Sequence, residues 1–135
     1  MRAFRIVIAG HGTLPAALIS TTELIVGPLA DVAPAGLGPD DSPDGYAEAL
    51  RAAIGHDGRR ALVLCDLLGG TPFNVASTIS RRSARVVCVA GVNLAMCVEA
   101  VLADGDLDEA LVEHLLEAGR SGIAETARHR ARRAS

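Results

Sequence analysis

The chain has 135 residues, of which 50% are hydrophobic and only 2% aromatic, and its formal net charge is −3 at pH 7. This length predicts one domain with a core of aliphatic side chains, and the weak negative charge gives no reason to expect nucleic acid as a partner. All 13 basic residues are arginine. The lack of lysine excludes mechanisms that need one, such as a Schiff base or a Walker A loop.

No apolar run approaches the roughly 20 residues that a membrane helix needs. The apolar segment that starts at Ile6 is too short for a signal peptide and ends in Gly10-His11-Gly12. We therefore expect a cytoplasmic protein. The three cysteines, at positions 65, 88 and 97, have no paired spacing and lie in apolar surroundings. This pattern predicts reduced, buried thiols and neither a disulfide framework nor a metal site.

Apolar runs alternate with amphipathic segments along the chain, which predicts a doubly wound α/β fold: an open, mainly parallel sheet with helices on both faces. Buried runs predict strands at residues 4–9, 31–36, 60–65 and 85–90. Helices are expected at about residues 14–26, 44–54, 72–80 and 94–102, and from 106 or 108 onward. We predict the common strand order 2-1-3-4.

Helix ends and faces can also be predicted. Thr71 can cap the helix that follows it, with Pro72 at the first helical position. In the first helix, Leu14, Leu18 and Ile25 predict one apolar face, and positions 107, 111, 115 and 118 do the same for the last one. Residues 1–124 are expected to form the domain. Residues 125–135 form a polar, arginine-rich tail whose last residues we expect to fray.

His11 and Asp66 follow the first and third predicted strands. In the order 2-1-3-4 the chain reverses between these strands, and ligands bind beyond their carboxyl ends. The two side chains should therefore converge although 55 positions separate them in the sequence. A carboxylate that accepts a hydrogen bond from one ring nitrogen fixes the tautomer and leaves the other nitrogen free as a nucleophile.

The helices that start after these strands expose free N–H groups and positive dipole ends, which stabilise an anion beside His11. We expect phosphate contacts from Gly12, Thr13, Gly70 and Thr71, and a supporting wall from the loop that carries Gly91 and Asn93. Such a set is suited to phosphoryl transfer through phosphohistidine. Each feature also has a simpler interpretation: His11 as a packing residue, Asp66 as a cap, and each glycine turn as a helix entry.

Three stretches, IVIAGHGTLPAALI, CDLLGGTPFNVAS and VAGVNLAMCVEAV, resemble in order and spacing the hallmark segments of the mannose-family IIA domain of the bacterial phosphotransferase system. The resemblance extends from about residue 4 to residue 124. It implies a homodimeric phosphotransferase whose histidine takes a phosphoryl group from phospho-HPr on Nε2 and passes it to a IIB component for sugar uptake. The membrane components IIC and IID are then only indirect partners, and no cofactor or metal is implied.

By position, the resemblance makes His11 the phosphorylated nucleophile, Asp66 the residue that orients its ring, and Thr71 a contact of the phosphoryl oxygens. Some members carry a hydroxyl residue directly after the aspartate, whereas this chain has Leu67 followed by Leu68. The cradle must then rely more on Thr71 and the backbone, and the apolar pair is a candidate docking surface. The resemblance also implies that an antiparallel strand exchanged between subunits, as in that family's dimer, could be added to the sheet by the segment after residue 119.

Three other classes of protein share some of these features. The domain that feeds dihydroxyacetone kinase shares the fold and the histidine, but serines typically surround that histidine, unlike Gly10 and Gly12 here. A receiver domain needs an acidic pair after the first strand and a lysine, and the chain has neither. A stand-alone regulator, whose phosphorylation state reports metabolic status, remains open because the chain shows only the IIA-like unit.

Overall fold

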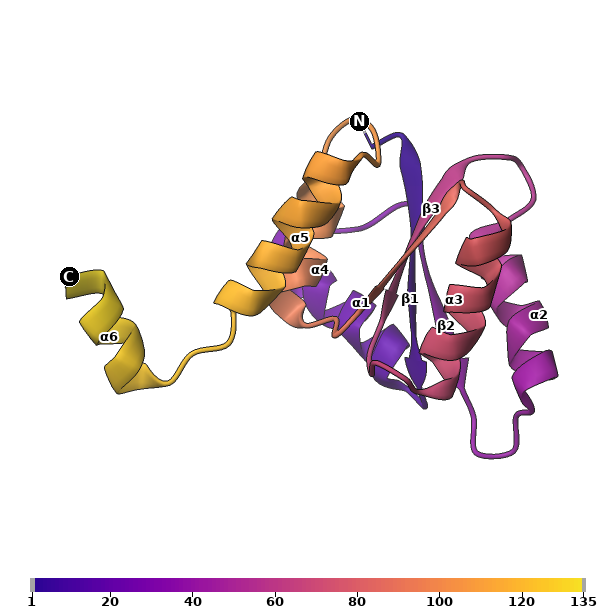
Figure 1. The fold of residues 1–135 in the computed structure, drawn as a ribbon, viewed down its shortest axis with the longest axis horizontal. Coiled ribbons are helices and arrows are strands. Elements are labelled where there is room, and N and C mark those ends of the chain that lie inside the picture. The colour runs from indigo at the N-terminus through magenta and orange to yellow at the C-terminus, as the bar shows by residue number, and fades with distance from the viewer. Residues whose placement is uncertain (1, 135) are drawn as a thin grey trace.

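Four parallel strands form the centre of the computed structural model, which describes residues 2–134 (Figure 1). The strands are β1 (Phe4–His11), β2 (Val32–Leu37), β3 (Arg60–Cys65) and β4 (Val86–Ala90). Their order in the sheet is β2-β1-β3-β4, and every neighbouring pair is parallel. The predicted fold class and strand order are confirmed. Strand β1 continues two residues beyond the predicted end because Gly10 and His11 pair with Gly36 and Leu37 of β2.

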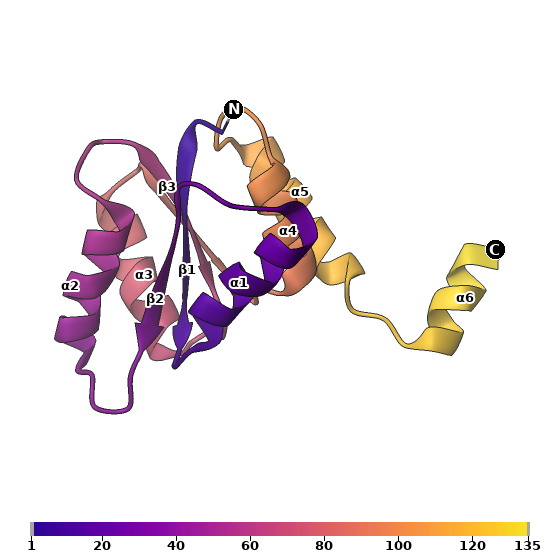
Figure 2. The same cartoon turned by 180° about the vertical axis from the view of Figure 1, so that it is seen from behind.

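Helices cover both faces of the sheet. They are α1 (Leu14–Val26), α2 (Pro43–Ile54), α3 (Thr71–Arg82), α4 (Leu94–Leu102), α5 (Glu109–Ser121) and α6 (Thr126–Ala134). Figures 1 and 2 show α2 and α3 on one face, and α1, α4 and α5 on the other. None of the helices within residues 2–134 has the length and apolar character needed to cross a lipid bilayer.

The core consists of two layers, one on each face of the sheet. Val7 and Val63 pack with Tyr46 and Leu50 on the side of α2 and α3. The opposite layer also draws on β1, β3 and the helices on that side: Phe4, Ile6, Ile8, Leu62, Leu64, Met96 and Leu115. Side chains on both faces of the two central strands are thus buried. This explains why β1 and β3 read as continuous apolar runs in the sequence.

The predicted cap of α3 was wrong, whereas Asp108, one of the two predicted starts of the last helix, is confirmed as its cap. Thr71 does not cap α3, since Gly70 occupies the cap position and Thr71 is the first helical residue. No side chain makes a capping hydrogen bond there. Leu107 lies before α5, because Asp108 caps that helix by accepting a hydrogen bond from the Leu111 N–H.

The predicted apolar face of α1 was also wrong in part. Leu18 packs against the core, but Leu14 and Ile25 are 43% and 57% exposed. Pro15 and Thr22 are buried in their place, and the Thr22 hydroxyl donates to the Leu18 carbonyl at 2.7 Å. Because α1 is apolar around most of its circumference, its sequence alone does not determine which side faces the sheet.

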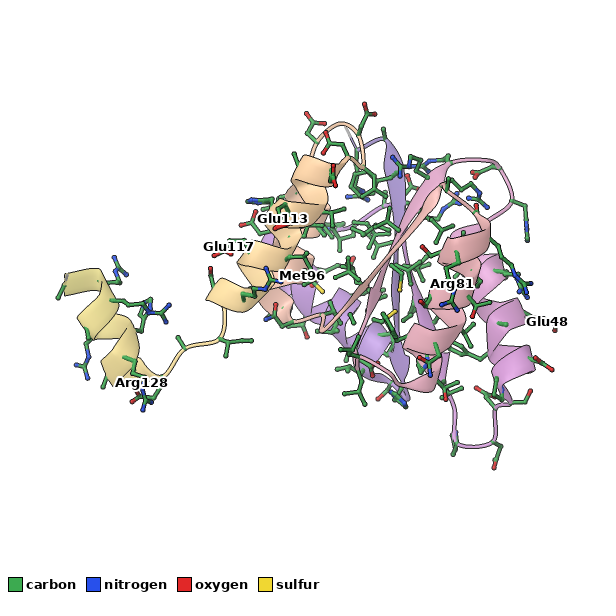
Figure 3. The ribbon with its side chains drawn as sticks, viewed as in Figure 1. Glu48, Arg81, Met96, Glu113, Glu117 and Arg128 are labelled. Atoms are coloured by element: carbon green, nitrogen blue, oxygen red, sulfur yellow. The ribbon has the colours of Figure 1, made fainter. Side chains whose placement is uncertain are left out.

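The tail does not fray as expected within residues 126–134. It forms α6, which stands apart from the sheet with all of its described residues exposed, including Arg128 (Figure 3). The Glu125 carboxylate starts this helix by accepting hydrogen bonds from the N–H groups of Ala127 and Arg128. Alanine and arginine are also strong helix formers. The segment expected to supply an exchanged strand is therefore mostly helical, in α5 up to Ser121 and in α6 from Thr126.

Candidate active site

His11 and Asp66 meet at the carboxyl edge of the sheet. His11 is the last residue of β1, and Asp66 follows β3 directly, with Ala9 and Cys65 paired in the register of the two strands. A single carboxylate oxygen, Asp66 Oδ2, accepts hydrogen bonds from both the His11 backbone N–H and its Nδ1, each at 2.9 Å. The His11 side chain is 47% exposed, whereas that of Asp66 is 11% exposed. The carboxylate thus fixes the orientation of an imidazole that is accessible to solvent.

Asp66 is ionised in this environment. Burial raises the pKa of its carboxyl group, but hydrogen bonds from the His11 backbone N–H and imidazole outweigh that effect and bring the pKa below its usual value. A carboxylate has no proton to donate, so Nδ1 must be the donor. The neutral His11 ring then carries its proton on Nδ1. Its Nε2 keeps a free lone pair.

Glycine at position 10 makes this close approach sterically feasible. A Cβ atom placed on Gly10 would lie 2.8 Å from both Cγ and Oδ2 of Asp66. Gly36, on the neighbouring strand, is equally constrained, because a Cβ there would collide with the carbonyl oxygen of Gly12. The sequence placed residue 36 at the end of a predicted strand and did not reveal this requirement for glycine.

Gly70 brings the start of α3 against the imidazole. A Cβ on Gly70 would lie 2.9 Å from His11 Cε1 and 3.6 Å from Nε2. The Gly70 N–H donates to the Leu67 carbonyl at 3.1 Å, and the Gly12 N–H donates to the Leu37 carbonyl at 2.8 Å. Gly70 therefore provides space next to the ring, while the N–H groups of both glycines are already engaged.

Two free donors of this region lie in the first turn of α3. Thr71 is the first helical residue, and Pro72 has no N–H. The first N–H group of α3 that has a backbone acceptor is that of Asn74, which donates to the Gly70 carbonyl at 2.9 Å. Within residues 2–134 the N–H groups of Thr71 and Phe73 have no acceptor. Sequence reasoning identified Thr71 but missed Phe73, although the position of Pro72 offered that signal.

The remaining predicted residues lie around this centre. Thr13 occupies the cap position of α1 without a capping side-chain hydrogen bond. The loop after β4 is anchored beside Asp66, because the Val92 N–H donates to the Cys65 carbonyl at 2.9 Å. Gly91 has a φ of +80° there. Asn93 caps α4 through the Met96 N–H and donates to the Gly119 carbonyl at 2.8 Å, so its side chain joins α4 to α5.

Tyr46 of α2 is buried and holds strand β2, and the sequence did not predict this role. It is 1% exposed, and its hydroxyl donates to the Ala35 carbonyl at 2.7 Å. Burial raises its pKa, and negative charge on Cys65 or Asp66 would raise it further. The tyrosine therefore remains a neutral donor that joins α2 to β2.

The cysteines and the other histidines lie outside this constellation. Cys65 and Cys97 are buried as predicted, whereas Cys88 is half-buried. His114 lies 2.9 Å from Glu99 on the helical side of the molecule. No cluster of three or more metal-ligating side chains occurs in the part of the chain that the structure describes.

Comparison with known proteins agrees with this geometry. The model of the EIIA-man family, described as "PTS system fructose IIA component", matches residues 5–118. The chain belongs to this family. The "PTS system mannose-specific EIIAB component" of Escherichia coli (strain K12) is 33% identical over an alignment of 123 residues. This alignment covers 87% of this chain and 38% of the relative. The chain therefore spans well under half of that curated relative.

Two solved structures show the family fold. The phosphotransferase system component EIIA from Streptococcus agalactiae has a TM-score of 0.85 and 32% identity, covering 94% of this chain and 98% of its own. The mannose/sorbose-specific IIA subunit from Enterococcus faecalis also has a TM-score of 0.85, with 33% identity over 93% of this chain and 95% of its own. The family membership inferred from the three hallmark stretches is confirmed.

Proposed function

We propose that this family member is a phosphohistidine carrier of sugar uptake, which accepts a phosphoryl group from phospho-HPr on His11 and passes it to a IIB component. One observation carries the proposal: Asp66 Oδ2 holds both the backbone N–H and Nδ1 of His11 at 2.9 Å. This arrangement fixes the ring and leaves Nε2 as the nucleophilic atom. Residues 1–124 would form the transfer domain and 125–135 an appended tail.

The transfer step follows from this tautomer. The Nε2 lone pair attacks the phosphorus atom, a P–N bond forms at His11, and the P–N bond to the donor histidine breaks, returning its electron pair to the donor ring. The proton on Nδ1 remains there. The phosphorylated ring therefore carries positive charge, which the Asp66 carboxylate stabilises at hydrogen-bond distance. A second transfer of the same kind unloads the carrier: a IIB histidine attacks the phosphorus atom, and the P–N bond at His11 breaks.

The first turn of α3 would hold the phosphoryl oxygens. Its free Thr71 and Phe73 N–H groups and the positive end of the helix dipole favour an anion beside Nε2. The Thr71 hydroxyl is a further donor. A side chain at position 70 would press on the imidazole close to Nε2. Glycine there would leave this space open for the phosphoryl oxygens.

Apolar side chains around His11 fit the docking of protein partners. Leu67 and Leu68, directly after Asp66, are 60% and 73% exposed, and Leu14 at the start of α1 is 43% exposed. Large apolar side chains exposed together are typical of interaction sites. We propose that HPr and IIB cover these three leucines in turn, which would also exclude water from the reacting atoms.

A second apolar surface lies away from the histidine. Leu24 and Leu102 are 86% and 63% exposed, and Ile25 lines a groove between α1, α4 and α5 together with Leu94 and Val98. We propose that this surface forms the homodimer interface. The contact would not require an exchanged strand.

Phosphorylation in solution tests the proposal. Incubation with phosphoenolpyruvate, enzyme I and HPr should produce the phosphorus NMR resonance of an Nε2-phosphohistidine, and an added IIB domain should remove it. If this chain shows no phosphohistidine resonance after it has been separated from phosphorylated HPr and enzyme I, the proposal is overturned. A resonance from an Nδ1-phosphohistidine on the separated chain would contradict the assigned role of Asp66.

A further inference from the structure

A hollow of about 200 Å³ lies between the C-terminal ends of α2 and α3. These ends precede β3 and β4, so the hollow opens at the amino edge of the sheet, at the opposite end of the strands from His11. Ile54, Ile79 and Val86 give it an apolar floor. No role in phosphoryl transfer was assigned to these residues.

Three arginines surround this floor. The arginines that line it are Arg51 of α2, Arg82 in the last turn of α3, and Arg85 directly before β4. Arg51 and Arg82 are exposed. Arg85 donates to the carbonyl groups of Arg59 and Gly55 at 2.6 and 2.7 Å. Its side chain is thereby fixed while its charge remains unneutralised.

No acidic residue lines the hollow. Among residues 2–134, no carboxylate pairs with Arg51, Arg82 or Arg85. Asp57 is nearby in sequence, but Arg5 holds it at 3.0 Å. The two helix C-termini contribute roughly half a negative charge each, which offsets about one of the three guanidinium charges. The hollow keeps a positive charge of about two.

We propose that this hollow binds a small phosphorylated metabolite. Guanidinium groups match the oxygens of a phosphate, and Arg51 and Arg82 are the two whose hydrogen-bond donors have no partner among the described residues. The carbon part of the ligand would lie on the floor of Ile54, Ile79 and Val86. Ligand pockets for larger molecules measure roughly 300–1,000 Å³, so this smaller hollow favours a single small phosphate ester over a nucleotide.

Glucose 6-phosphate is a suitable probe, because glucose and inorganic phosphate are its two halves. Titration of the complete chain, followed by amide NMR shifts, should show saturable binding at millimolar concentration, with shifts at Ile54, Ile79 and Val86. Inorganic phosphate should bind more weakly, and glucose should not bind. Absence of saturable shifts would overturn the proposal. Equal affinity for inorganic phosphate and glucose 6-phosphate would overturn the role of the apolar floor.

Two variants distinguish binding in this hollow from nonspecific attraction of the probe to the positive charge of the surface. Arg51→Gln with Arg82→Gln should weaken binding of the probe by roughly tenfold or more, since both charge-assisted contacts are lost. Arg81→Gln is the matched control: Arg81 is an exposed neighbour on the same helix, outside the hollow (Figure 3). It should change affinity by no more than about twofold. Equal weakening by Arg81→Gln would contradict a specific site.

The inference does not depend on the proposed function. His11 lies at the other edge of the sheet, so His11→Ala should leave the affinity for glucose 6-phosphate unchanged. Loss of binding in that variant, with the fold intact by circular dichroism, would contradict the location of the site. Failure of phosphoryl transfer alone would not affect the inference.

Discussion

Asp66 Oδ2 lies 2.9 Å from the backbone nitrogen of His11 and 2.9 Å from its Nδ1, so one oxygen atom fixes both the main chain and the ring of the same residue. The other oxygen, Oδ1, is buried and has no hydrogen-bond partner among residues 2–134. Both hydrogen bonds of 2.9 Å that Oδ2 accepts therefore come from His11. The relationship explains why replacement of Asp66 should affect the orientation of the nucleophile more than the fold.

Asp66→Asn should slow phosphoryl transfer by roughly ten- to a hundredfold, because a hydrogen bond to a charged group is worth about 1.5–3 kcal/mol. The asparagine cannot provide the negative charge that stabilises the phosphorylated ring. Rates of transfer from phospho-HPr, measured by rapid quench, test this expectation. Asp57→Asn, which removes a carboxylate paired with Arg5 elsewhere on the molecule, should leave the rate unchanged. An unchanged rate in Asp66→Asn would contradict the orienting role.

The same pair predicts a pH-dependent stability. The folded pKa of Asp66 is lowered, so between that value and the unfolded pKa of about 3.9 the unfolded chain binds more protons. The stabilisation is thus present above pH about 3.9 and is lost as the pH falls through the folded pKa. The difference in Tm between wild type and Asp66→Asn should therefore narrow in acid. Thermal unfolding at several pH values measures it, and a constant difference would contradict the prediction.

Gly70→Ala should impair transfer with little loss of stability. The added methyl group would lie 2.9 Å from His11 Cε1, so the ring must move away from the start of α3. We expect transfer to fall by roughly tenfold or more, in line with the effect of small misplacements of a reacting group. Gly45→Ala is the matched control, because Gly45 lies in α2 and its added Cβ would meet only Ser42 Oγ, at 3.1 Å. Equal activity of the two variants would argue against the contact.

Tyr46→Phe should lower the free energy of unfolding by about 1 kcal/mol, because the Ala35 carbonyl loses a buried hydrogen bond of 2.7 Å. Denaturation by urea measures this change. Since the Tyr46 hydroxyl bonds to Ala35 and His11 bonds to Asp66, the rate of transfer should change by less than about threefold. A large loss of transfer at unchanged stability would give Tyr46 a direct role that the geometry does not support.

Leu68→Ser should raise the KM for phospho-HPr and leave kcat nearly unchanged, because Leu68 is 73% exposed beside Asp66 and takes no part in the core. Leu24→Ser removes an even more exposed leucine of α1 and serves as the control, with KM for phospho-HPr expected to remain the same. Steady-state phosphorylation at varied HPr concentration distinguishes the two. Equal KM values for Leu68→Ser and wild type would contradict a docking role for this residue.

The sequence predicted the parts of the structure that follow from local patterns and sheet topology. The bounds of β3 and α4 agree with the predicted ones. The meeting of His11 and Asp66 followed from the reversal of chain direction between parallel strands. Such topology places strand ends together without any knowledge of side-chain packing.

What the sequence did not predict depends on tertiary contacts. The N–H groups of Gly12 and Gly70 are occupied by the carbonyls of Leu37 and Leu67, which no local pattern reveals. The inward face of α1 depends on packing, because apolar residues lie on most of its sides. Helix α6 escaped detection because its charge suggested a frayed end, whereas capping by Glu125 and good helix formers outweigh the repulsion between its arginines.

The most direct test of the central claim is the identity of the phosphorylated histidine. Incubation with labelled phosphoenolpyruvate, enzyme I and HPr should give an acid-labile label on the wild-type chain and none on His11→Ala. His114→Ala is the matched control, since His114 is also exposed and also lies 2.9 Å from a carboxylate, Glu99; this variant should be labelled as the wild type is. A label that persists in His11→Ala, or disappears in His114→Ala, would contradict the assignment of His11 as the phosphoryl carrier.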